Sequence, residues 1–228
     1  MEQNLADRSY HYLKNKLAAG ELSSGDQLVN RSLAAEIGVS VVPVREAITR
    51  LANEGLVDRI PGAGAFVRKT DRQDLDNLYV LRDALESAAA SEAARFITED
   101  ELEELESIVD EAEQLRDDIA GQSRGYATKR QLNAWLDQEQ LFHELLIDAS
   151  RNPLLAKVTR EYRAIGEIFD AQRNSPKVLD EEVAKATCLG KRELIEALKR
   201  RDARRARDLM SAQIQRGRKS VLRQLRRR

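Results

Sequence analysis

The chain has 228 residues, of which 42% are hydrophobic and 34% are charged, a composition typical of a helix-rich globular protein with one or two domains. It contains no apolar run long enough to span a bilayer and no charged segment followed by an apolar leader, so we expect no membrane partner. The single cysteine, Cys188, excludes an internal disulfide and a multi-cysteine zinc site, and it indicates a reducing cytoplasm.

The formal net charge of −1 conceals three segments of different charge. Residues 1–70 carry a net +1, residues 71–190 carry −13 and residues 191–228 carry +11. We expect the acidic and basic segments to pair with each other on adjacent helices, and a contact of the basic end with phosphate is the alternative.

Glycine and proline concentrate before residue 70, which indicates short elements joined by tight turns. The apolar spacing predicts three helices and then two short strands hinged at residues 61–64. The helices are expected at about 6–19, 32–37 and 41–54, and the strands at 56–60 and 65–68.

From residue 71 onward the pattern is helical, with apolar residues at three- and four-residue steps and no convincing strand. Such stripes run over residues 78–96, 102–115, 135–149, 154–169 and 183–198, and Asp202 is expected to cap a last helix. The sequence therefore predicts a mainly α protein. An N-terminal domain of residues 1–70 precedes an all-helical bundle of six or seven helices in residues 71–228.

The helix pair before residue 55 has the features of a helix-turn-helix, with Gly38 at the turn and Ser40 as a cap. Pro43 falls in the first turn of the second helix, where its missing N–H costs nothing. Val44, Ile48 and Leu51 are expected to face the core. The opposite, solvent-facing stripe is expected to contain Val42, Arg45, Glu46 and Thr49.

Arg45 carries the chemical argument for DNA binding, because a guanidinium can donate two parallel hydrogen bonds to guanine O6 and N7. Arg31 and Ser40 suit phosphate contacts. The alternative is an ordinary three-helix unit in which Arg45 is a solvated surface charge.

Three segments carry a more specific signal: residues 20–28 (GELSSGDQL), 33–57 (LAAEIGVSVVPVREAITRLANEGLV) and 61–67 (PGAGAFV). They closely resemble the winged helix-turn-helix of the GntR family of bacterial transcription regulators, over about residues 5–70. The resemblance implies that Arg31, Ser40, Arg45 and the wing glycine Gly62 contact DNA. The full set that we predict at the DNA is Arg31, Ser40, Val41, Val42, Pro43, Arg45 and Gly62.

This chain departs from the family at the start of the second helix. The family usually has an arginine and then a threonine or similar polar residue, where this chain has Val41 and Val42. Valine has no hydrogen-bonding group, so its available base contact is the C5-methyl of thymine. The two valines therefore read apolar base edges or make no base contact.

Residues 79–86 (YVLRDALE), 141–155 (LFHELLIDASRNPLL) and 194–206 (LIEALKRRDARRA) are similar to the all-helical effector domain of the FadR subfamily, called FCD. Many such domains hold a metal through an aspartate and three histidines. By that resemblance Glu139 takes the acidic position, His143 is retained, and Lys191 and Gln213 replace the other two histidines. Because an ammonium is not a metal ligand, we expect no metal and no other cofactor.

The sharper hypothesis for this site is that Lys191 takes the place of the metal and pairs with Glu139. The predicted effector-binding set, which would receive an anionic or polar small molecule, is Arg82, Glu139, His143, Lys191 and Gln213. The alternative is a closed internal salt bridge in which His143 is an ordinary core histidine.

The resemblance implies a cytoplasmic transcription regulator, expected to be a repressor, that binds a partly palindromic double-stranded operator as a homodimer under effector control. A first alternative is an effector-independent DNA-binding regulator with a vestigial ligand site. A second is an enzyme. The chain argues against an enzyme, because it has two histidines, one cysteine and no glycine-rich phosphate loop.

Overall fold

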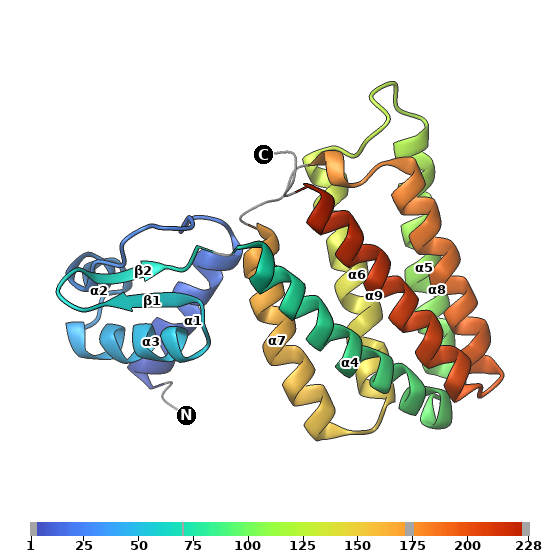
Figure 1. Cartoon of the computed structure of the whole chain (residues 1–228), viewed down its shortest axis with the longest axis horizontal. Coiled ribbons are helices and arrows are strands. Elements are labelled where there is room, and N and C mark those ends of the chain that lie inside the picture. Colours follow the sequence, from blue (N-terminus) through green and yellow to red (C-terminus); the bar gives the residue numbers. More distant parts are fainter. Residues whose placement is uncertain (1–3, 70, 172–175, 225–228) are drawn as a thin grey trace. The chain divides into compact units, whose positions relative to one another are not determined.

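The computed structural model describes residues 4–69, 71–171 and 176–224 and separates the chain into two compact units. The first unit contains residues 1–71 together with 164–173, and the second contains residues 72–163 and 174–228. Figure 1 shows the helices and strands of each unit.

Three helices form the first unit's core: α1 (Leu5–Ala18), α2 (Asn30–Ile37) and α3 (Val41–Asn53). Val44, Ile48 and Leu51 of α3 are buried, as their helical spacing predicted. Gly38 ends α2 in the left-handed conformation, with φ of 75°, and this sharp turn leads directly into α3. Helix α2 begins two residues earlier than predicted, because the carbonyl of Val29 already accepts the Leu33 amide at 3.0 Å.

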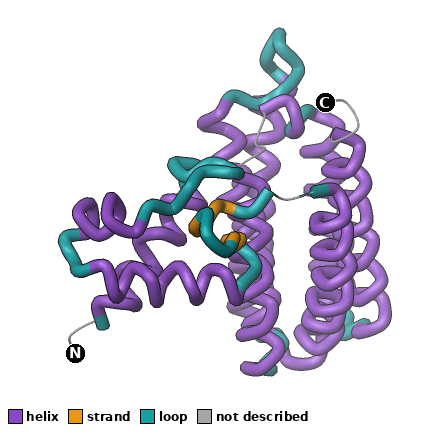
Figure 2. The backbone as a smooth tube through the Cα atoms, turned by 60° about the vertical axis from the view of Figure 1, so that its left-hand side comes forward, coloured by secondary structure: helices purple, strands orange, loops and turns teal. Residues whose placement is uncertain are grey.

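The predicted hairpin is present as β1 (Val57–Ile60) and β2 (Gly64–Val67), paired antiparallel from Val57↔Val67 to Ile60↔Gly64. The extended segment at residues 25–28 runs along the free edge of β2. The Leu28 amide donates to the Ala65 carbonyl, and the Val67 amide donates to the Asp26 carbonyl, both at 2.8 Å. Figure 2 shows the two short strands (orange) with their flanking loops.

Six α-helices and one short 3₁₀ helix follow in the described residues, within the predicted range of six or seven. Helix α4 packs along α9, and α5 packs against both α6 and α8. No helix among the described residues has the length and apolarity needed to cross a membrane. The helices are α4 (Arg72–Phe96), α5 (Glu99–Ala120), α6 (Lys129–Ala149), α7 (Pro153–Ala171), η1 (Pro176–Val178), α8 (Glu181–Lys199) and α9 (Ala203–Gln224).

Polar residues at the helix starts explain where these helices begin. Thr98 and Thr128 each form a reciprocal capping box with the residue three positions later, which satisfies amides that have no partner inside the helix. Asp202, the predicted cap, accepts the Arg205 amide at 2.9 Å through its carboxylate. Helices α8 and α9 pack against each other as a hairpin joined at Asp202.

The acidic middle and the basic end of the chain pair with each other, as their charges predicted. Lys199 of α8 lies 2.6 Å from Glu106 of α5, and Arg192 of α8 binds Asp110 and Glu113 of α5. In the same way, Arg218 of α9 lies 2.7 Å from Asp76 of α4 and holds the pKa of that carboxyl below its ordinary value. These ion pairs join neighbouring helices of the second unit.

Candidate functional site

Helix α3 presents an outer face that is available for contacts in the first unit. Val42 is 59% exposed, Arg45 and Glu46 are exposed, and Thr49 is half-buried. The Thr49 hydroxyl donates to the Arg45 carbonyl at 2.8 Å, so it is satisfied within the helix. The predicted solvent-facing stripe is therefore present.

The start of α3 differs from the prediction in two details. Ser40 occupies the N-cap position, but its exposed hydroxyl makes no capping hydrogen bond and is left for another partner. Pro43 is buried. Its ring packs inward and shapes the first turn, so its side chain does not lie on the outer face with Val42 and Arg45.

The two arginines predicted to contact DNA, Arg31 on α2 and Arg45 on α3, are both exposed, and neither forms an ion pair with a described residue. By contrast, Arg50, near the other end of α3, lies 3.2 Å from Asp7 and 3.5 Å from Glu54. The unpaired guanidinium of α3 is therefore the one near the helix start, where base edges are read in helix-turn-helix proteins.

The hairpin turn is held by Gln27, a residue whose role the sequence did not reveal. Gly62 adopts φ of 77° at the exposed turn, a conformation that favours glycine. Gln27 donates through Nε2 to the Ala63 carbonyl at 2.9 Å, and a Cβ on Gly64 would lie 3.1 Å from that nitrogen. Gln27 thus holds the turn that carries Gly62. Because Gln27 and Ala63 are 36 residues apart, local spacing contains no signal for this contact.

The second unit contains a buried lysine at the predicted site. Lys191 of α8 is fully buried, with 0% exposure, and its Nζ lies 2.6 Å from Glu139 Oε1 of α6. The same ammonium lies 4.4 Å from the centroid of the Phe142 ring. It is thus held by a carboxylate and by the negative face of an aromatic ring. The pairing of Lys191 with Glu139 that the sequence suggested is present.

His143 connects this pair to helix α4 through a residue that the sequence analysis missed. Its Nδ1 lies 2.7 Å from Glu86 Oε2, and its Nε2 lies 4.0 Å from Glu139 Oε2. Glu86 is 1% exposed and also accepts from Arg82 Nε at 2.8 Å. The resulting buried charge chain runs over α4, α6 and α8 and consists of Arg82, Glu86, His143, Glu139 and Lys191.

Gln213 of α9, the last member of the predicted set, lies next to this chain. Its Nε2 donates to the Gly190 carbonyl at 2.9 Å, one residue before Lys191. Lys191 stands eleven residues before Asp202 and Gln213 eleven after it, so the two positions come to the same level of the α8–α9 hairpin.

The residues at this site do not fit the metal that the FCD resemblance implies. Within the described ranges, no group of three His, Cys, Asp or Glu side chains is placed to hold a metal ion. The Glu139 carboxylate, which would be a ligand, is in contact with the Lys191 ammonium instead. An ammonium has only hydrogen-bond donors and adds a positive charge where a dication would sit.

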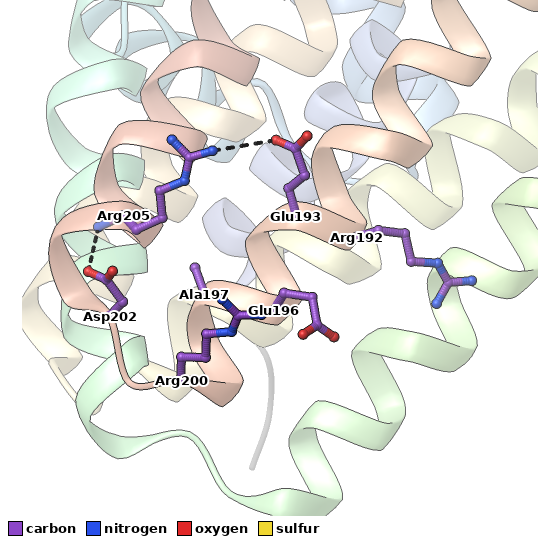
Figure 3. A pocket seen from close by; sticks show the side chains of 7 residues that line it. All are labelled: Arg192, Glu193, Glu196, Ala197, Arg200, Asp202 and Arg205. Carbon is purple, nitrogen blue, oxygen red and sulfur yellow. Dashed lines mark hydrogen bonds and ion pairs between the residues drawn. The ribbon is translucent and has the colours of Figure 1, made fainter.

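A separate surface pocket of about 390 Å³ lies at the α8–α9 turn (Figure 3). Arg205 lies 3.9 Å from Glu193 across it, and the Asp202 carboxylate accepts the Arg205 amide. Cations and carboxylates both line this pocket. Its lining contains none of the predicted effector residues and consists of Arg192, Glu193, Glu196, Ala197, Arg200, Asp202 and Arg205.

These features define a winged helix-turn-helix protein with a second, all-helical domain. The family model of bacterial regulatory proteins of the gntR family matches residues 5–67, and the FCD domain model matches residues 77–216. The chain therefore belongs to the GntR family, in the FadR subfamily that carries an FCD domain. The family and the relatives are transcriptional regulators rather than enzymes.

Named relatives agree with this assignment. The HTH-type transcriptional regulator McbR of Escherichia coli is 26% identical over 149 residues, 65% of this chain and 62% of McbR. The HTH-type transcriptional repressor RspR of the same species is 28% identical over 144 residues, 63% of this chain and 58% of RspR. The matched stretch thus spans about three fifths of each of these two relatives.

Two solved structures share the fold. E. coli McbR/YncC has a TM-score of 0.70 at 23% identity and covers 97% of this chain and 98% of its own. A GntR regulator from Rhodococcus sp. RHA1 has a TM-score of 0.71 at 18% identity, with coverage of 95% and 97%.

Proposed function

We propose that this protein is a cytoplasmic, sequence-specific DNA-binding regulator that acts as a homodimeric repressor on a partly palindromic operator. The observation that carries the proposal is the exposed Arg45 on the outer face of α3, which forms no ion pair with a described residue, in a chain of the GntR family. Residues 1–70 would bind the DNA, and residues 71–228 would bind the effector and form the dimer. A two-fold dimer would place one α3 in each half-site.

Different exposed groups of the first unit would contact the bases and the phosphates of the DNA. Arg45 would read guanine in the major groove, while Arg31 and the free hydroxyl of Ser40 would bind phosphates. Gly62 would bring the wing backbone close to the DNA. Val42, being more exposed than the half-buried Val41, would supply most of the apolar base contact.

We propose that a small effector acts on the buried charge chain of the helical domain, next to Gln213. An anionic group would compete with Glu139 for Lys191 and with Glu86 for Arg82, which would loosen the contacts among α4, α6 and α8. An effector-independent regulator is the second candidate, and the observation that favours it is that Lys191 and Glu139 already form an ion pair with each other. Effector control is supported if a small anion raises the melting temperature of the protein and also changes its affinity for the operator.

Genomic footprinting with the purified full chain tests the main proposal. We expect a small set of protected sites with a partial two-fold repeat, because a symmetric dimer reads two related half-sites. The genes beside those sites would give the pathway, and transcription from those promoters should fall when the protein is added. If the protein shows no sequence preference at every salt concentration tested, the proposal is wrong.

The contact of the valines with DNA gives a separate prediction. Replacing thymine by uracil in the operator removes only the C5-methyl, so it should weaken binding at the step next to the guanine read by Arg45. Titration of labelled duplexes measures the effect, and uracil at a thymine outside the half-sites is the control. Val41→Arg should shift preference at that step toward guanine and raise non-specific affinity through its added charge. If uracil is silent at every thymine of the half-site, the valines contact no methyl group.

A further inference from the structure

We infer that the Lys191 ammonium is a built-in cation that links α8 to α6, in the place where the family's metal would act, and that His143 and Glu86 extend this link to α4. This inference goes beyond the proposed regulator function and does not depend on DNA binding. It rests on the buried charge chain Arg82–Glu86–His143–Glu139–Lys191 and on the mismatch between these side chains and a metal ion.

Burial requires Lys191 to have a partner of opposite charge. A charged group removed from water is costly unless it is paired, and Lys191 is 0% exposed. Its Nζ lies 2.6 Å from Glu139 Oε1 and 4.4 Å from the centre of the Phe142 ring, and both contacts come from α6. The ammonium therefore bonds α8 to α6 at the position where a shared metal would otherwise connect them.

The same chain already contains two cations and two carboxylates. Arg82 and Lys191 supply the positive charges, and Glu86 and Glu139 supply the negative charges. Glu86 lies at His143 Nδ1, which leaves Nε2 as the nitrogen that faces Glu139. A divalent cation at this point would meet an ammonium that competes for the same carboxylate. The site thus excludes the metal by charge as well as by its lack of ligands.

The structure also indicates that histidines at positions 191 and 213 could create a metal site. Position 213 adjoins position 191 through the hydrogen bond from Gln213 Nε2 to the Gly190 carbonyl, so imidazoles at both positions would face the same level of the bundle. Imidazole nitrogens together with the Glu139 carboxylate form a ligand set that suits zinc. An imidazole is shorter than a lysyl chain, so Lys191→His removes the competing charge and leaves room beside Glu139.

Zinc content and melting temperature of the full chain, purified without a metal-affinity step, test the inference. The wild type should carry well under one equivalent of zinc, manganese or nickel, and EDTA should leave its melting temperature unchanged. The variant Lys191→His/Gln213→His should bind about one equivalent of zinc and melt at a higher temperature with zinc than with EDTA. Lys191→His alone should bind zinc more weakly than the double variant. If the double variant does not fold, zinc uptake by this single variant tests the inference instead.

Stoichiometric metal in the wild type, or a fall of its melting temperature in EDTA, would overturn the inference. So would a folded double variant, shown by circular dichroism, that takes up no zinc, because positions 191 and 213 would then not converge on Glu139 and His143. All these readings are made without DNA, so a failure here is distinguishable from a failure of the proposed regulator function.

Discussion

Replacement of Glu139 by glutamine should lower the free energy of unfolding by about 3–5 kcal/mol, because it leaves the ammonium of Lys191 buried without its counter-charge. Lys191 is 0% exposed, so water cannot replace the lost carboxylate. Lys191→Met should also destabilise the protein, because Glu139 Oε1, the oxygen that faces Lys191, is itself buried although the side chain as a whole is 25% exposed. Urea denaturation of each variant measures both values.

The double variant Glu139→Gln/Lys191→Met should cost clearly less than the sum of the two single changes, because it leaves neither charge without a partner. The surface pair Lys199–Glu106 is a matched control. It has the same residue types and the same 2.6 Å distance, but its side chains are 37% and 36% exposed. Its coupling energy should be about 0–1 kcal/mol. Additive effects at Lys191 and Glu139 would show that the two side chains do not interact in solution.

Arg45→Ala should weaken operator binding by about 1–3 kcal/mol and relax the preference at one base pair in each half-site. The effect is expected because Arg45 is exposed on the outer face of α3 with no ion pair to a described residue, so its guanidinium can bind both acceptors of a guanine. Titrations on the operator, on single-base variants of it and on random DNA measure the loss and its sequence dependence.

Arg45→Lys is the matched control for this prediction. Lysine keeps the positive charge but cannot donate two parallel hydrogen bonds from a planar group. It should therefore retain the affinity for random DNA and lose most of the preference for guanine. If Arg45→Ala weakens operator and random DNA equally, Arg45 binds only phosphate, and specificity must come from another residue.

The agreement between sequence and structure is closest where the signal is local. Val44, Ile48 and Leu51 are buried and Arg45 is exposed, because a helix brings residues three and four apart to one face in any context. The αL turn at Gly38 likewise follows from one residue type. Pro43 differs because a residue in the first turn of a helix can point either way, and packing around it decides which.

The sequence predicted only some of the contacts between residues that are far apart in the chain. The Lys191–Glu139 pair could be predicted, because the FCD resemblance places both positions at one site. Glu86 could not. It stands four residues after Arg82, which by itself indicates a solvated helical pair. Its 1% exposure and its contact with His143 arise from the packing of α4 against α6.

The sequence by itself determined the order of elements, the core face of α3 at Val44, Ile48 and Leu51, the winged helix-turn-helix resemblance and the absence of two histidines from the metal set. Each of these depends on residue type and on spacing within one element. Only the tertiary structure decided that Gln27 holds the wing turn and that Glu86 completes a buried charge chain with His143 and Lys191. The physical reason is that burial, and therefore the strength of a charge, is set by the neighbouring helices and strands, which a local pattern does not contain.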